Sequence, residues 1–391
     1  MRVMRGEARG RAAGGARPGG AGTRVRTGIL GRVTQLRTVQ VLGGGSAGSS
    51  AHVRSLASGL AARGVRVTVC APAALDHEYD FTGAGARLVP LPPPSDPAGV
   101  AALRHACIGA DLVHAHGLTA GVRAALALAG SPYTPFVMTW HTRRPAEGPR
   151  AGLARLLERR TVRAATVVLG TCSELVDLAR ARGARDARLA PVSVPVPRTP
   201  LCLQDGKARA ELGAVERPLL IAAGSLSAGR GYRTLLDAAG RWRELDPAPL
   251  LVIAGEGPAR PVLRRRITQE DLPVRLVGHR GDLAELIAAA DVAVLPSRWE
   301  ARAVLAQEAL RLGVPLVATA VGGVPELVGD AAELVPYGDA RALARAVEGL
   351  LADPDRRSSL AAAGRVQAAT WPSEDATVAH VLSVYDELTG R

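Results

Sequence analysis

Short apolar stretches alternate along the chain, from Thr38 onward, with longer stretches in which apolar residues recur every three or four positions. The longer stretch after the first apolar run places Val53, Leu56 and Leu60 on one face of a predicted helix, which ends at Gly64. The short runs predict buried strands in this part of the chain: VQVL (39–42), VRVTVC (65–70), DLVHAH (111–116) and FVMTW (136–140).

A proline-rich segment, Leu189–Leu203, interrupts this alternation, and its four prolines predict a linker. The alternation then restarts, and a last amphipathic helix is expected over Ser373–Leu388. The strands predicted after the linker are LLIAAG (219–224), LLVIAGEG (250–257), VRLVG (274–278), VAVLPS (292–297), PLVATA (315–320) and AELVP (332–336).

Two successive series of this kind predict an α/β fold with two parallel sheets, each covered by helices on both faces. We expect a disordered tail over 1–37, a first domain over 38–195, a second domain over 196–372, and a C-terminal helix over 373–391 that packs back on the first domain. Ligands of such sheets bind beyond the carboxyl ends of the strands, so the expected site is a cleft between the two domains.

The positive charge is concentrated in the tail. The 391 residues carry a formal net charge of +13, and residues 1–37 hold nine arginines and one acidic residue, Glu7. This segment of Gly, Ala and Arg has no periodic pattern, which predicts disorder, and N-terminal sequencing would show whether it precedes the true start. Aromatic residues make up only 3% of the chain, so no stacking platform for bases is expected and we predict no nucleic-acid partner.

The four cysteines, Cys70, Cys107, Cys172 and Cys202, show no C-x-x-C spacing, which fits free thiols in a reducing compartment. No apolar run reaches the roughly 18 residues that a membrane span needs. The N-terminus lacks the apolar region of a secretory signal. We therefore expect a cytoplasmic protein.

The stretch VLGGGSAGSSAHV (41–53) contains the letters G-x-G-x-x-G at Gly43, Gly45 and Gly48. A dinucleotide site would also need an acidic residue at the end of the second strand to hold the ribose. That strand is followed by APAAL, and Asp76 comes too late, so an NAD-dependent oxidoreductase is the weaker interpretation. The glycines still allow a ligand to approach the backbone at a helix start.

Two glutamates in LPSRWEARAVLAQEALRLGVP carry the most informative pattern. Glu300 follows a strand, where ligands bind, and Glu308 falls on the apolar helix face expected to include Val304. A carboxylate there is costly unless it is paired, so a structural pair with an arginine is the alternative to ligand binding. Eight residues of helix span roughly 12 Å, which is too long for the two carboxylates of a glycosidase but suits two ends of one extended ligand.

Several motifs occur here in the order typical of one enzyme family. GSLSAGRGYRTLLDAA, LVIAGEGP, the E-x7-E pair and GVPLVATAVGGVPELV resemble the retaining GT-B glycosyltransferases of family 4, and GGGSAG, DLVHAHG and MTWHT add weaker similarity. The resemblance runs from about Thr38 to the C-terminus. It implies two Rossmann-like domains facing across a cleft, the first for the acceptor and the second for a nucleotide-sugar donor.

The resemblance also implies roles for single residues. Glu308 matches the glutamate that holds the ribose, Glu300 the one beside the donor sugar, and Arg230 the lysine that faces the diphosphate. Ser225 stands where the family usually has an arginine. The loss of that charge predicts a diphosphate affinity at least tenfold lower.

Other donor-site residues follow from the same motifs. The turn after Glu300 departs from the family pattern, and Arg302 is a candidate to restore a cation near the phosphates. An unchanged donor affinity in Arg302→Ala would reject that hypothesis. The remaining donor-binding candidates are Gly224, Gly255 and His279, of which His279 is expected to border the base.

On the acceptor side, the resemblance implies that His141 reaches the donor sugar, so we name His141 and Glu300 as catalytic candidates, with a buried structural histidine as the alternative. His52 has no clear role. We interpret the alternation of His114 and His116 as turning them to opposite faces of their strand, so the pair is not expected to bind a metal. The acceptor and phosphate loop is predicted to comprise Gly44, Gly45, Gly48 and His116.

Neither a metal nor a cofactor is predicted. Asp353 to Asp355 spell D-x-D, but they lie between two helical stretches and indicate a helix break with an N-cap. The leaving diphosphate would then be stabilised by amides, helix N-termini and arginine. The helix over Arg150–Arg163 has leucines flanked by arginines, which suits contact with the inner face of a membrane, but a plain surface helix is the interpretation we favour.

These observations predict a metal-independent transferase of the hexosyltransferase type that moves a sugar from a nucleotide-sugar to an acceptor with retention of configuration. The acceptor, a small molecule, a lipid or a polysaccharide, is left open. The alternative suggested by Ser225 and the altered turn is a catalytically weakened homologue that binds sugar nucleotides.

Overall fold

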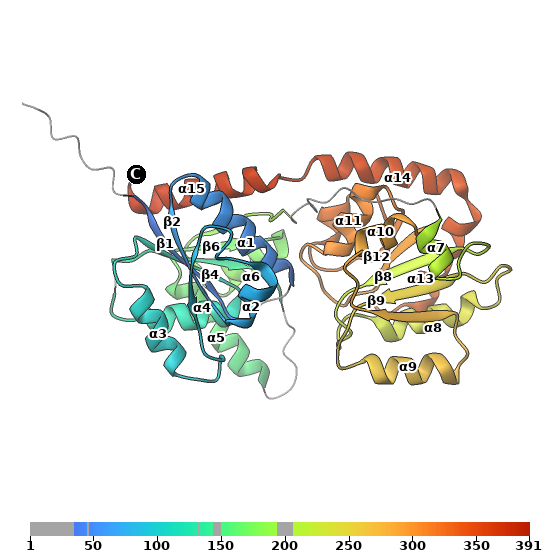
Figure 1. Ribbon diagram of the computed structural model, residues 1–391, viewed down its shortest axis with the longest axis horizontal. Helices are drawn as coiled ribbons and strands as arrows, with labels where there is room; N and C mark the ends of the chain where they lie inside the picture. The colour runs from blue at the N-terminus through green and yellow to red at the C-terminus, as the bar shows by residue number, and fades with distance from the viewer. Residues whose placement is uncertain (1–34, 45–46, 132, 144–149, 194–205) are drawn as a thin grey trace, which may run out of the picture. The chain divides into compact units, whose positions relative to one another are not determined.

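The computed structural model describes residues 35–44, 47–131, 133–143, 150–193 and 206–391. They form two parallel sheets with helices packed against them (Figure 1). The predicted α/β class with two parallel sheets is therefore confirmed. The predictions for residues 1–34 of the tail, for Gly45, for Cys202 and for the 195/196 boundary lie outside the described residues. The predicted end of the tail at residue 37 is wrong, because Leu36 is buried and Arg37 begins the first strand.

Sheet A has seven strands in the order β3-β2-β1-β4-β5-β6-β7. The strand order reverses between β1 and β4, the point at which open parallel sheets bind ligands. The strands are β1 (Arg37–Leu42), β2 (Arg66–Ala71), β3 (Arg87–Pro90), β4 (Leu112–His116), β5 (Phe136–Trp140), β6 (Val167–Gly170) and β7 (Ala187–Leu189). The helices between them are α1 (Ala47–Ala62), α2 (Ala74–Tyr79), α3 (Ala98–Ala106), α4 (Leu118–Ala127), α5 (Arg150–Ala164) and α6 (Ser173–Ala181).

Sheet B has six strands in the order β10-β9-β8-β11-β12-β13, and its order reverses between β8 and β11. The strands are β8 (Leu219–Ala223), β9 (Leu250–Ala254), β10 (Val274–Gly278), β11 (Val292–Leu295), β12 (Leu316–Thr319) and β13 (Glu333–Val335). The helices are α7 (Lys207–Glu211), α8 (Tyr232–Trp242), α9 (Arg260–Gln269), α10 (Leu283–Ala288), α11 (Val304–Leu312), α12 (Val324–Val328), α13 (Ala340–Ala352) and α14 (Pro354–Ala369).

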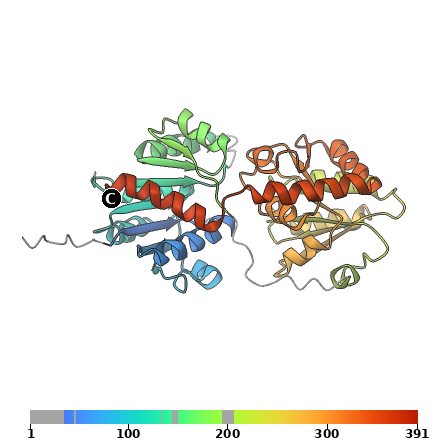
Figure 2. The same ribbon diagram turned by 90° about the horizontal axis from the view of Figure 1, so that it is seen from above.

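The last helix, α15 (Glu374–Thr389), packs with sheet A although it follows sheet B in sequence. Its Val378, Val381 and Tyr385 belong to the same buried cluster as residues of α1 and β1, and Figures 1 and 2 show α15 beside α1. Ser373 caps the helix by accepting a hydrogen bond from the Ala376 amide. We call sheet A with α1–α6 and α15 the first lobe, and sheet B with α7–α14 the second lobe.

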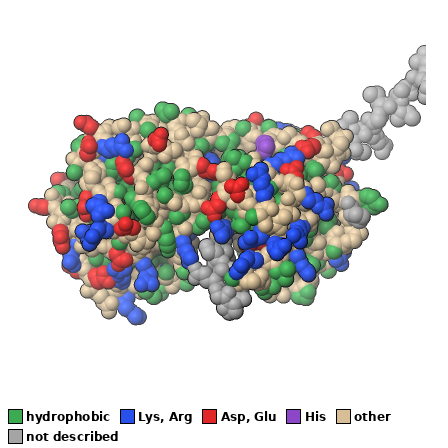
Figure 3. Space-filling view, turned by 180° about the vertical axis from the view of Figure 1, so that it is seen from behind, with side chains coloured by type: hydrophobic (Ala, Val, Ile, Leu, Met, Phe, Trp, Pro, Cys, Tyr) green, Lys and Arg blue, Asp and Glu red, His purple; other side chains and the backbone are tan. Residues whose placement is uncertain are grey.

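Many surface charges are paired locally. Arg188 bonds Asp186 and Glu387, and Arg266 bonds Asp237 and Glu270. Figure 3 shows one face, on which acidic and basic side chains lie side by side at several places. Much of the positive charge outside the tail is therefore neutralised by near neighbours.

Two further observations bear on the sequence predictions. The cysteines Cys70, Cys107 and Cys172 are buried and free. Within the described ranges, no helix combines the length and the apolarity that a membrane crossing requires.

Candidate functional site

The carboxyl ends of β8 and β11, where sheet B reverses its order, hold the strongest cluster of predicted residues. Ser225 and Arg230 follow β8, and Glu300 follows β11. Arg230 donates from Nη1 to Glu300 Oε1, which also accepts a 2.9 Å bond from the Ser297 hydroxyl. The structure thus brings Glu300 and Arg230, two residues predicted to bind the donor, into direct contact.

The backbone beneath this pair is fixed by hydrogen bonds from neighbouring strand ends. The Thr319 hydroxyl, at the end of β12, donates to the Ser297 carbonyl at 2.6 Å. The Gly323 amide donates to the Glu300 carbonyl at 2.8 Å. Sequence reasoning missed Ser297 and Thr319, although both lie at the carboxyl end of an apolar strand, the position that could have identified them.

Glycines bring the loops of this edge into close contact. Gly224 follows β8 and Gly255 follows β9, and both have positive φ angles, +147° and +144°. A Cβ added at Gly255 would lie against the Gly224 carbonyl, and one at Gly231 would lie against the Pro296 carbonyl. Glycine is therefore required here because two backbones approach where a side chain would collide.

Glu308 lies on α11 and is 9% exposed, and its carboxylate accepts a 3.3 Å bond from Arg311. Burial raises the pKa of Glu308, while the arginine opposes that shift. The expected apolar face was partly wrong, because Val304 is exposed and α11 is buried from Leu305 to Leu310. The Glu308–Arg311 ion pair is the structural pairing predicted as the alternative to ligand binding. Binding of a ligand by Glu308 stays a prediction.

The other donor-side candidates differ in their surroundings. Ser225 is exposed and its hydroxyl bonds that of Ser227 at 3.1 Å. His279 is exposed directly after β10. Arg302 instead donates from Nε to the Val192 carbonyl at 2.9 Å and lies over the Trp371 ring, and burial lowers its pKa to about 10. A role of Arg302 at the phosphates stays a prediction.

The second cluster lies at the carboxyl ends of β1 and β4, where sheet A reverses its order. Gly43 and Gly44 follow β1, His116 ends β4, and His141 follows β5. Gly44 has a φ of +82°. Gly48 lies in the first turn of α1, where an added Cβ would be 3.7 Å from Val304. Both predicted sets of residues therefore occupy the positions where parallel sheets bind ligands.

The expectation that His114 and His116 point to opposite faces was wrong. Their ring centroids lie 4.2 Å apart. Side chains alternate with a period of two along a strand, so residues two apart share a face. His114 bonds Tyr385 and Thr139 through its two ring nitrogens, at 2.6 and 2.7 Å.

One group in the described part of the chain has the composition of a metal site. His52, His116 and His141 are buried, and one ring nitrogen of each lies within 4.8 Å of the others. His116 Nδ1 and His141 Nε2 face each other at 3.3 Å, a separation that also fits a hydrogen bond. Burial lowers the pKa of His52 to about 4 and holds those of His116 and His141 well below their usual value, so all three are neutral at pH 7.

Two other sequence features have structural explanations. Asp76 accepts bonds from the Phe81 amide and the Thr82 hydroxyl, so it shapes the turn after α2. Asp353 caps α14 by accepting from the Arg356 amide at 2.8 Å, which confirms the predicted N-cap.

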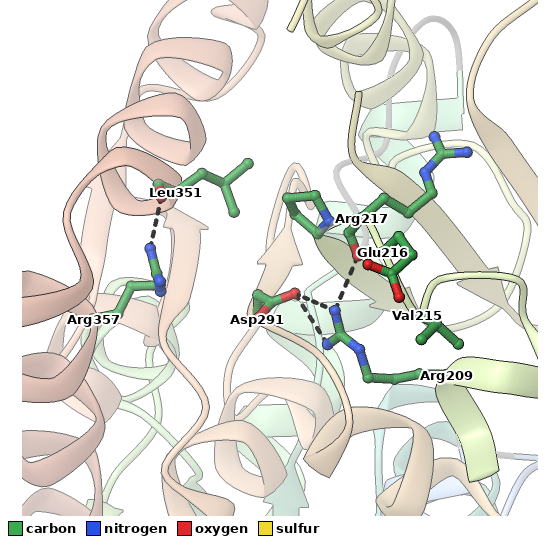
Figure 4. Close-up of a pocket in the computed structure, with 8 residues that line it drawn as sticks. Arg209, Val215, Glu216, Arg217, Asp291, Leu351 and Arg357 are labelled. Atoms are coloured by element: carbon green, nitrogen blue, oxygen red, sulfur yellow. Dashed lines mark hydrogen bonds and ion pairs between the residues drawn. The ribbon is translucent and has the colours of Figure 1, made fainter. Parts of the chain in front are cut away.

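A surface pocket of about 350 Å³ lies elsewhere, at the amino ends of β8 and β11 (Figure 4). Its arginines are engaged with the protein: Arg209 bonds Asp291 and Arg357 bonds the carbonyls of Leu350 and Leu351. Ligands of parallel sheets bind at the opposite, carboxyl ends of the strands. We therefore do not interpret this pocket as the ligand-binding site.

Comparisons with known proteins cover both lobes. Residues 47–195 match the family described as "Glycosyl transferase 4-like domain", and residues 205–367 match "Glycosyl transferases group 1". The chain is 33% identical to the D-inositol 3-phosphate glycosyltransferase of Xylanimonas cellulosilytica over 310 residues, which cover 72% of this chain and 73% of that protein.

Two further matches differ in extent. The chain is 34% identical to the alpha-D-kanosaminyltransferase of Streptomyces kanamyceticus over 163 residues, 39% of this chain and 42% of that protein's length. Among solved structures, Anabaena Alr3699/HepE in complex with UDP and glucose shares 20% identity at a TM-score of 0.77, covering 90% of this chain and 99% of that one. That likeness supports the GT-B architecture.

Proposed function

The chain belongs to the group 1 glycosyltransferase family, and we propose that it moves a sugar from a nucleotide-sugar donor to an acceptor. In this proposal the second lobe holds the donor at the carboxyl edge of sheet B. The observation that carries the proposal is the contact of Arg230 with Glu300 beside Ser297, at the point where sheet B reverses its order.

We propose that the donor binds by displacing Glu300 from its ion pair with Arg230. Burial lowers the pKa of Arg230, but an arginine stays protonated at neutral pH. In the free protein Arg230 and Glu300 neutralise each other. A diphosphate would compete for the guanidinium and release Glu300 Oε1 to accept hydrogen bonds from the hydroxyls of the donor sugar.

The chemistry we propose is a displacement on one face of the sugar. The bond from C1 to the diphosphate oxygen breaks, the acceptor oxygen bonds C1 from the same side, and the acceptor proton passes to the leaving diphosphate. Configuration is then retained. The negative charge on the diphosphate is stabilised by Arg230 and by backbone amides rather than by a metal ion.

In the first lobe we assign His141 to the donor sugar and the glycine loop to the acceptor side. His141 is neutral because burial holds its pKa well below the usual value. A neutral imidazole can accept or donate one hydrogen bond to a sugar hydroxyl without adding charge to the site. HepE was solved in complex with UDP and glucose, and we expect ligands of the same chemical class here.

The first test is binding and turnover with a panel of nucleotide-sugars. A true donor present at about 100 times its Kd stabilises the folded protein by about 2.7 kcal/mol, which raises its melting temperature. Arg230→Ala should abolish that rise, whereas Arg345→Ala, an exposed arginine on α13, should keep it.

The second readout is release of nucleoside diphosphate and the anomeric configuration of the product by NMR. Binding without release would identify the catalytically weakened homologue instead. A rise in melting temperature with NAD and none with any nucleotide-sugar would overturn the proposal. An unchanged donor affinity in Arg302→Ala would show that Arg302 does not contribute to the donor site.

A further inference from the structure

A chain of buried polar side chains connects the C-terminal helix to His141. Its members are at most 2% exposed, and they come from β1, β4, β5 and α15: Gln40, His114, His116, Thr139 and Tyr385. Gln40 Nε2 lies 3.0 Å from the Tyr385 hydroxyl, and Gln40 Oε1 lies 3.0 Å from His116 Nε2. His116 Nδ1 then faces His141 Nε2 at 3.3 Å.

The hydrogens of this chain follow from what each partner can donate. The Gln40 amide nitrogen donates to the Tyr385 oxygen, which leaves the Tyr385 hydroxyl hydrogen available to His114 Nδ1, 2.6 Å away. Gln40 Oε1 can only accept, so His116 carries its hydrogen on Nε2 and its Nδ1 is an acceptor. His141 therefore donates from Nε2, which leaves its Nδ1 unprotonated.

We propose that Gln40 and Tyr385 are positioning residues that fix the tautomer and ring orientation of His141 for sugar transfer. This inference rests on the proposed function, since it assigns His141 to the sugar. The imidazoles stay neutral because burial lowers the pKa of His114 to about 3 and those of His116 and His141 well below the usual value. One arrangement of hydrogens can then persist at neutral pH.

The network could also serve only to dock α15 on sheet A, and the experiment must distinguish that role from the positioning of His141. Tyr385→Phe and Gln40→Met each remove one link of the chain, and Val384→Ala serves as a control. Val384 is a buried residue of the same helix outside the network. Its loss weakens docking by about 1–3 kcal/mol without touching a hydrogen bond.

If the side chains position His141, kcat falls about tenfold in Gln40→Met and about threefold in Tyr385→Phe, with the KM for the donor unchanged. The double variant is no slower than Gln40→Met, because both act through one chain. Val384→Ala keeps the wild-type kcat. A loss of kcat that follows stability across all three variants would overturn the inference.

A readout that needs no turnover separates this inference from the proposed function. In protein labelled with ¹⁵N-histidine, the shifts of His141 should report hydrogen on Nε2 in the wild type and in Val384→Ala, and a mixture of tautomers in Gln40→Met. An unchanged tautomer in Gln40→Met would overturn the inference even if the enzyme is active. The expected shifts in a protein that turns over no donor would refute only the proposed function.

Discussion

At the scale of single residues, Ser225 is the clearest departure from the pattern that the family resemblance implies. It is exposed in the loop after β8 that also carries Arg230, and its hydroxyl hydrogen-bonds that of Ser227. We predict that Ser225→Arg lowers the Kd for nucleoside diphosphate about tenfold or more, because a charge-assisted hydrogen bond contributes about 1.5–3 kcal/mol. Isothermal titration calorimetry measures the change.

The matched control for that variant is Ser358→Arg, which adds the same charge on the exposed face of α14. It should leave the Kd unchanged at 0.15 M salt, where distant surface charges are screened. Equal affinity in both variants would mean that position 225 does not face the diphosphate.

A second residue-scale prediction concerns His52, whose burial lowers its pKa from 6.5 to about 4. The unfolded chain therefore takes up the proton first as the pH falls. The stability that His52 contributes is complete above about pH 6.5 and is lost between about pH 6.5 and pH 4. We predict that the melting temperature of His52→Gln falls less over this range than that of the wild type.

The exposed His105 provides the comparison for His52. His105→Gln should follow the wild-type curve of melting temperature against pH. If the His52→Gln curve also runs parallel to the wild type, burial of His52 does not govern acid stability.

At the scale of elements, Gly231 controls how α8 meets the loop that carries Glu300. It caps α8 with a φ of +71°, and an added Cβ would lie against the Pro296 carbonyl. We predict that Gly231→Ala lowers the free energy of unfolding by about 1–3 kcal/mol and weakens nucleotide binding as the loop shifts. Urea melts and titration of the nucleotide measure the two effects.

Gly349 is the contrasting position, because it lies inside α13 with no atom near an added Cβ. Gly349→Ala should stabilise the protein by up to about 1 kcal/mol, as alanine favours helix over glycine. A similar loss of stability in both variants would show that backbone approach at Gly231 is not the cause.

The sequence predicted the longer elements well, and its failures have physical causes. The predicted strands are present as β1, β2, β4, β5 and β8–β13. The prediction did not include the short strands β3, β6 and β7, which span three or four residues. β3 and β7 are the edge strands of sheet A and are only partly buried, so they lack the apolar run that marked the equally short β11, β12 and β13.

The candidate site was predictable only in part. Arg230 and Glu300 follow predicted strands, and the structure brings them into contact. Tyr385 could not be connected to His114 from the sequence, because 271 positions separate them and no local pattern reports such a contact. The two-residue period of a strand already places His114 and His116 on the same face. The expectation that they point to opposite faces rested on a misreading of that period.

At the scale of the whole molecule, the first lobe depends on a helix that comes last in the chain. Val378, Val381 and Val384 are at most 3% exposed, and each contributes about 1.5–3 kcal/mol through burial. Their sum is comparable with the 5–15 kcal/mol that stabilises a typical domain. We predict that a variant ending at residue 372 has an unfolded first lobe and a folded second lobe.

Limited proteolysis followed by mass spectrometry tests this prediction. The truncated variant should lose the fragments of the first lobe rapidly and retain a fragment that spans sheet B. A variant that lacks only Gly390 and Arg391 should resist proteolysis like the full chain. Equal resistance of the first lobe in both variants would contradict a structural need for α15.

The position of α15 also sets an order of events during translation. About 180 residues separate the last described residue of the linker, Ser193, from Ser373, and a ribosome needs roughly 10–40 s to add them. Throughout that interval the nascent first lobe lacks the helix that covers its apolar surface, while the second lobe emerges as one uninterrupted segment. The half synthesised later is therefore the one that can finish folding first, and the earlier half must be shielded from aggregation until its final helix leaves the exit tunnel.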